Sequence, residues 1–143
     1  MRHSHQRRIP GTVLAEAAHA LASRESDLAQ CQSFDELFGI VDETILPIPG
    51  AGELLVYDVA HRIGGYLGLK PDRIYLHTGT RLGARSLGLR LTRALSNCRI
   101  SRPLRRLGAD QLEDVLCIYR ATLARLYLGE STNLSGRRSI RRC

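Results

Sequence analysis

Two groups of polar side chains near the middle of the chain have the types and spacing for acid–base chemistry. Asp58 and His61 lie three residues apart, so on a helix a carboxylate would neighbour an imidazole and could orient it for proton transfer. The candidate polar pocket contains these two residues and four more with hydroxyl or imidazole groups: Tyr57, Asp58, His61, His77, Thr78 and Thr80. A His–carboxylate pair without a third group is more often structural, so we assign no catalytic residue and rank an enzyme third.

The segment from Tyr75 to Arg85 could instead bind an anion. Thr78 or Thr80 would cap a helix. The first amides of this helix, together with Arg81 and Arg85, could donate hydrogen bonds to the anion. The alternative is that the threonine only caps the helix and that Arg81 and Arg85 are solvated, with no anion bound. The segment lacks the GxxxxGK[ST] pattern of a phosphate-binding P-loop.

Histidines and cysteines show no metal-ligand spacing, so we expect no metal and no cofactor. The four cysteines, Cys31, Cys98, Cys117 and Cys143, contain no CxxC pair. Cys31 and Cys117 fall within helical patterns, which predicts small buried side chains in a reducing, cytoplasmic setting. No apolar stretch approaches the ~18 residues that a membrane span requires.

Positive charge is concentrated in the C-terminal half. Residues 1–72 hold five Arg and one Lys against ten Asp or Glu, whereas residues 73–143 hold fifteen Arg against four, and the chain's formal net charge is +7. This distribution predicts either a polyanionic partner or an acidic protein surface. No aromatic residues are interleaved with the densest basic stretch, which favours contacts with a nucleic-acid backbone over base stacking. The candidate contacts are Arg81, Arg85, Arg90, Arg93, Arg102, Arg105 and Arg106, with Arg99 in the same stretch.

A second nucleic-acid signal is the turn Pro49-Gly50-Ala51-Gly52 between two predicted helices. This segment, about residues 45–60, resembles the helix-hairpin-helix module of DNA-binding proteins. The resemblance implies that the amides around Gly50 and Gly52 approach a phosphate, aided by the dipole of the second helix. Glu53 stands where that module often has a basic residue, and the alternative is a tight turn between packed helices.

Longer segments, residues 52–64, 74–85 and 112–119, resemble a group of bacterial proteins without a known activity. That resemblance implies a folded module and transfers no function.

Hydrophobic periodicity and end signals predict an all-α fold of about five helices. The helices are expected over 12–30, 33–45, 53–67, 78–95 and 110–128, with a short extended segment near 73–77. Ser33 and Glu36 form a capping box, Gly68 is a C-terminal cap, and Gly79, Gly83 and Gly88 suggest close packing or a broken helix. We expect a single helical domain over 11–128, a flexible basic arm over 1–10 and a basic, disordered tail over 129–143.

The leading functional hypothesis is therefore non-enzymatic binding to a nucleic-acid backbone, with duplex DNA as the expected form. The alternative is a protein-interaction or accessory subunit that uses the basic half as an interface. Composition predicts neither the oligomeric state nor the partner's identity.

Overall fold

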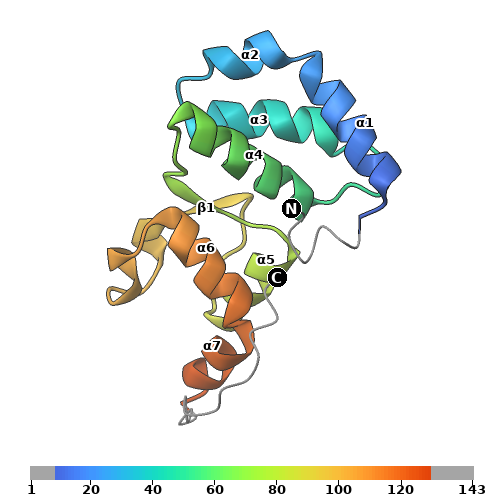
Figure 1. Ribbon diagram of the computed structural model, residues 1–143. Coiled ribbons are helices and arrows are strands. Elements are labelled where there is room, and N and C mark those ends of the chain that lie inside the picture. The colour runs from blue at the N-terminus through green and yellow to red at the C-terminus, as the bar shows by residue number, and fades with distance from the viewer. Residues whose placement is uncertain (1–8, 130–143) are drawn as a thin grey trace. The chain divides into compact units, whose positions relative to one another are not determined.

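The computed structural model describes residues 9–129, and the chain divides into two compact units, one ending at Pro71 and one beginning at Asp72 (Figure 1). The described residues are mostly helical, as predicted, with seven α-helices and one two-stranded sheet. The single helical domain expected over 11–128 thus spans both units, each of which we describe by itself. The predicted arm and tail lie almost wholly outside the described residues.

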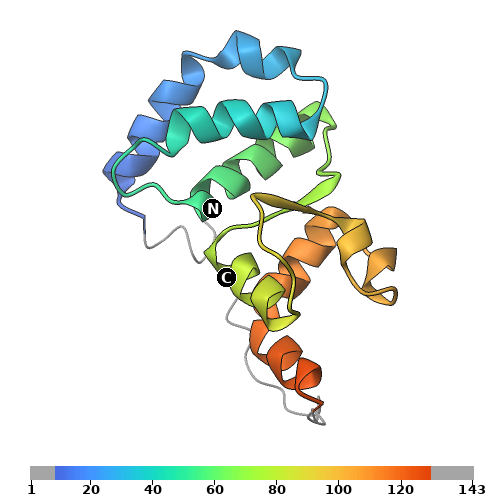
Figure 2. The ribbon, with the colours of Figure 1, turned by 180° about the vertical axis from the view of Figure 1, so that it is seen from behind.

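The first unit consists of four helices: α1 (Gly11–Ala22), α2 (Glu25–Gln30), α3 (Phe34–Ile45) and α4 (Glu53–Leu67). Helices α3 and α4 lie side by side, and α1 and α2 pack against α3 (Figures 1 and 2). The helix expected over 12–30 is two helices, because the backbone leaves helical geometry at Arg24, with φ of −111° and ψ of 15°. The hydroxyl of the preceding Ser23 donates to the Ala20 carbonyl at the end of α1.

Helix α3 begins with the predicted cap. Ser33 Oγ accepts from the Glu36 amide at 3.2 Å, and the Glu36 carboxylate accepts from the Gln32 amide at 2.8 Å, one residue before the amide expected in a capping box. The apolar face of α3 is buried, and it consists of Phe34, Leu37, Phe38, Val41 and Ile45. Gly68, with φ of +75°, ends α4 as predicted.

The second unit combines two strands with three helices. It contains β1 (Arg73–Tyr75), α5 (Thr78–Ser86), β2 (Ala94–Ser96), two 3-10 turns η2 (Asn97–Arg99) and η3 (Leu104–Arg106), α6 (Ala109–Ile118) and α7 (Arg120–Tyr127). Strand β1 confirms the predicted extended segment and pairs antiparallel with β2, so that Ile74 lies opposite Leu95. The core is a cluster of buried apolar side chains from both strands and all three helices: Ile74, Leu76, Ala84, Leu95, Ile100, Ala109, Leu112, Leu116 and Leu123.

Two predicted helix boundaries in this unit are wrong. The helix expected over 78–95 ends at Ser86, because Gly88 turns the backbone into the left-handed region at φ of +67° and residues 94–96 form β2. The helix expected over 110–128 is interrupted at Tyr119, whose ψ of 14° is not helical. The interruption at Tyr119 and the split of the first helix account for the two additional helices among the described residues.

Helices α5 and α6 approach closely at a glycine. A Cβ atom added at Gly83 would lie 2.0 Å from the backbone oxygen of Leu116, so only glycine allows this contact. The close packing predicted from the glycines of this helix is therefore confirmed at Gly83. Within residues 9–129 no helix has both the length and the apolar character needed to span a membrane.

Candidate sites in the second unit

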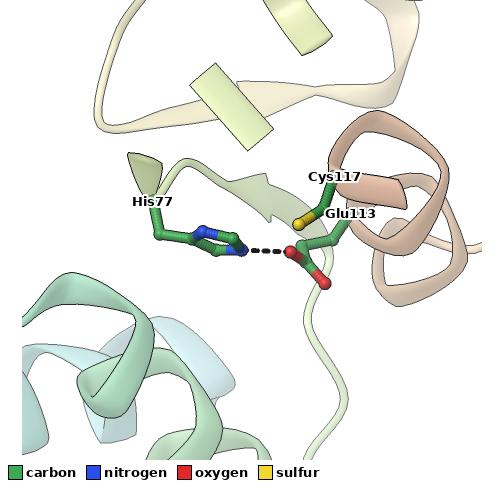
Figure 3. A group of neighbouring side chains, drawn as sticks. All are labelled: His77, Glu113 and Cys117. Carbon is green, nitrogen blue, oxygen red and sulfur yellow. Dashed lines mark hydrogen bonds and ion pairs between the residues drawn. The ribbon is translucent and has the colours of Figure 1, made fainter. Parts of the chain in front are cut away.

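Three side chains with metal-binding or acid–base chemistry converge between α5 and α6 (Figure 3). His77 precedes α5, and Glu113 and Cys117 lie on α6. All three are buried, and one donor atom from each lies within 4.8 Å of the others. We call His77, Glu113 and Cys117 the His–Glu–Cys cluster.

His77 is positioned by capping α5. Its Nδ1 accepts a hydrogen bond from the Gly79 amide at 3.2 Å, and its own backbone amide donates to Thr80 Oγ1 at 3.2 Å. Both bonds satisfy backbone amides at the start of a helix, which have no partner within the helix itself. The Thr-Gly-Thr sequence predicts a capped helix start here, but it predicts a threonine as the capping residue. The predicted cap at Thr78 or Thr80 is thus one residue or more away from the observed N-cap, His77.

The two ring nitrogens of His77 have opposite roles. Because Nδ1 accepts from an amide, the ring proton is assigned to Nε2, which donates to Glu113 Oε1. The side chain of Glu113 is only 9% exposed, and a buried carboxylate needs such a donor. This bond therefore ties the start of α5 to the middle of α6.

Cys117 lies one helical turn after Glu113 on the same face of α6. Its Sγ also faces the start of α5, since a Cβ at Gly79 would lie 2.6 Å from it. In the structure Cys117 is disulfide-bonded, whereas Cys31 and Cys98 are free thiols. The predicted burial is confirmed for Cys117, whereas Cys31 is half-buried and directly follows the end of α2. Neither the spacing of the cysteines nor the expected reducing setting predicts the disulfide.

Sequence reasoning named His77 but missed Glu113 and Cys117. Glu113 and Cys117 are four residues apart on an amphipathic helix. A carboxylate next to the core residue Leu112 is unusual at a buried position, and this is the feature of the sequence that indicates a site. The third member is 36 residues away from Glu113 and has no fixed spacing to it.

The other predicted pocket residues are distributed over both units. Tyr57, Asp58 and His61 lie on α4 of the first unit, where the exposed His61 ring stacks on the buried Tyr57 ring at a centroid distance of 5.7 Å. Thr80 is buried beside His77, and Thr78 is exposed. The structure therefore brings together His77 and Thr80, and separately Tyr57 and His61.

The arginines form the second candidate site. The described part of the second unit holds eleven arginines, of which Arg81 is half-buried and the others are exposed: Arg73, Arg85, Arg90, Arg93, Arg99, Arg102, Arg105, Arg106, Arg120 and Arg125. Its four carboxylates are Asp72, Asp110, Asp114 and the buried Glu113. All seven predicted arginine contacts thus belong to this unit.

Four of the exposed arginines lie within eight residues, on the connection from β2 to α6. We call residues 99–106, with Arg99, Arg102, Arg105 and Arg106, the arginine segment. The connection lies on one side of α6, and α5 lies on the other (Figures 1 and 2). Arg105 Nε donates to the Ile100 carbonyl at 2.6 Å, and η2 and η3 give the segment local structure.

The predicted hairpin glycines lie in the first unit, in the turn between α3 and α4. Gly50 has φ of +89°, which favours glycine, and Gly52 is the N-cap of α4 in an extended conformation. The Ala51 amide donates to the Ile48 carbonyl at 2.9 Å, so it already has an acceptor. The turn geometry is the one expected between two packed helices.

We compared the chain with known protein families, curated proteins and solved structures. No family model matches the chain, and no curated protein or solved structure matches it.

Proposed function

We propose that this protein binds the phosphate backbone of duplex DNA through the arginines of its second unit, chiefly those of the arginine segment. The observation that carries the proposal is the surplus of exposed guanidinium groups: ten exposed arginines against three exposed carboxylates in residues 72–129. An arginine fork matches a phosphate, and neutralising phosphates releases counterions from the duplex.

The guanidinium groups of the segment are available for such contacts. Among the described residues, no carboxylate lies within 4.0 Å of Arg99, Arg102 or Arg106. Arg105 uses Nε for the Ile100 carbonyl, which holds its side chain in place and leaves the terminal nitrogens for a ligand. A partly ordered set of forks loses less side-chain entropy on binding than four free ones would.

Backbone contact is favoured over base stacking. No Phe, Tyr or Trp occurs between residues 76 and 118, so the segment and its flanks offer no aromatic platform for unpaired bases. Contacts of this kind fix the protein on the duplex without reading its sequence. We therefore propose binding with little sequence preference.

We propose that the turn at Gly50 and Gly52 contributes little to phosphate binding. Its unit carries nine carboxylates against Arg24, Arg62 and Lys70 in residues 9–71, and Glu53 directly follows the turn. A phosphate would meet net negative charge there. The helix start alone does not offset that repulsion at physiological salt.

The test compares two variants of equal charge change. Arg99→Gln, Arg102→Gln and Arg106→Gln together remove three charges from the arginine segment, and Arg105 stays because it bonds to Ile100. The control, Arg24→Gln with Arg62→Gln and Lys70→Gln, removes three charges from the first unit. Anisotropy of labelled duplex DNA, single-stranded DNA and RNA at low salt gives the affinities.

We expect the segment variant to bind duplex DNA at least roughly tenfold more weakly than the wild type, and the control to bind as the wild type does. Equal weakening in both variants would show a diffuse charge effect and refute the role of the segment. Stronger binding of the single strand than of the duplex would contradict the form of nucleic acid proposed.

A further inference from the structure

We propose that the His–Glu–Cys cluster of the reduced protein is a Zn²⁺ site. Three donors of suitable types, from two elements, already face one another, and one donor atom of each lies within 4.8 Å of the others. This inference is independent of nucleic-acid binding, because it depends on buried side chains and not on the arginines.

The donor set favours zinc over the hard cations. A thiolate and an imidazole are ligands that Zn²⁺ prefers, whereas Mg²⁺ and Ca²⁺ take oxygen ligands. The Glu113 carboxylate completes a set of three, which leaves one position of a tetrahedral shell for water. Glu113 and Cys117, on the same face of α6, would form one side of the site, and His77 the other.

Charge balance at a buried position supports the same ion. A thiolate at Cys117 and a carboxylate at Glu113 would place two negative charges in a region where both residues are less than a tenth exposed. A divalent cation neutralises these charges, and a neutral imidazole from His77 adds none. The metal-bound cluster therefore carries no net charge, which burial requires.

Zinc binding would break one hydrogen bond at the start of α5. Coordination through Nε2 transfers the ring proton of His77 to Nδ1, which then no longer accepts from the Gly79 amide. The lost N-cap bond lowers the zinc affinity, but it is a small loss beside coordination of the metal by three protein donors. The start of α5 should therefore change when zinc binds.

The oxidation state of Cys117 decides whether the site can form. A sulfur in a disulfide is not a thiolate, so the disulfide form seen in the structure lacks one of the three ligands. Reduced protein should bind zinc, and oxidised protein should bind it far more weakly. The two forms of one chain are thus a matched pair.

The experiment is a Co²⁺ titration of the full chain, reduced and kept under argon, followed by displacement with Zn²⁺. Cys31→Ser, Cys98→Ser and Cys143→Ser in the background leave Cys117 as the one cysteine of the chain. We expect one Co²⁺ per chain with a thiolate-to-cobalt absorption band, and loss of that band in Cys117→Ser. Glu113→Gln keeps an acceptor for His77 and should lower the Zn²⁺ affinity at least roughly tenfold.

His61→Ala removes an exposed histidine from the first unit and should leave the titration unchanged. A second readout needs no variant: Zn²⁺ should raise the melting temperature of reduced wild-type protein and not of oxidised protein. The proposal is overturned if the absorption band persists in Cys117→Ser, or if reduced wild-type protein shows neither the band nor the thermal shift at micromolar metal.

Discussion

At the scale of single residues, His77 joins two helices of the second unit. One nitrogen caps α5 and the other holds the buried Glu113 carboxylate. We predict that His77→Ala lowers the free energy of unfolding by about 2–4 kcal/mol, since it removes an N-cap and leaves a buried carboxylate without its donor. Urea denaturation of metal-free protein measures this loss. His61→Ala is the control, and a loss below about 0.5 kcal/mol in both would contradict the structural role.

Cys31 offers a prediction about pH. Burial raises the pKa of the Cys31 thiol, and the nearby carboxylates of Glu36 and Asp27 raise it further. We predict that Cys31 reacts with iodoacetamide more slowly than free cysteine at pH 8, with the midpoint of its rate profile at higher pH, as measured by peptide mass spectrometry.

The sign of the accompanying stability effect follows from the raised pKa of Cys31. The folded state favours the protonated thiol, so its contribution is fully present below the pKa of the unfolded chain and is lost as the pH rises through the folded pKa. Asp27→Asn removes one of the two carboxylates and should speed the labelling. Labelling as fast as that of free cysteine in the wild type would contradict the raised pKa.

At the scale of elements, the packing of α5 against α6 depends on Gly83. A methyl group there would overlap the Leu116 carbonyl, which is backbone and cannot turn away. We predict that Gly83→Ala destabilises the protein by about 3 kcal/mol, measured by urea denaturation.

Gly65→Ala is the matched control on α4, where an added Cβ meets nothing within 4 Å. It should stabilise the protein by about 0.5–1 kcal/mol, because alanine is the better helix former at an open position. Equal effects of the two substitutions would show that helix propensity, and not the contact with Leu116, decides the outcome at Gly83.

Elements with local signals could be predicted from the sequence, and those fixed by distant contacts could not. The capping residues around Ser33 and the apolar period of α3 are local, as is the Gly68 end of α4, and all were found. Strand β2 exists because Leu95 pairs with Ile74, about twenty residues away, and no periodicity marks a three-residue strand. The link from His77 to Glu113 is likewise a product of the fold.

At the scale of the whole molecule, the two units carry opposite charge. Residues 9–71 hold nine carboxylates against three basic side chains, and residues 72–129 hold eleven arginines against four carboxylates. The charge split was readable from composition, and the structure adds that the division falls close to the boundary between the units. A polyanion is therefore attracted to one unit and repelled by the other.

The salt dependence of duplex binding shows whether the arginine segment contacts phosphates. For the full chain, the logarithm of the affinity should fall linearly with the logarithm of the salt concentration, by about 0.9 in slope for each phosphate contacted. Replacing Arg99, Arg102 and Arg106 with Gln should reduce the slope by about three, whereas replacing Arg24, Arg62 and Lys70 should leave it unchanged. No binding of the wild type at low salt, or a slope that the segment variant leaves unaltered, would contradict the account.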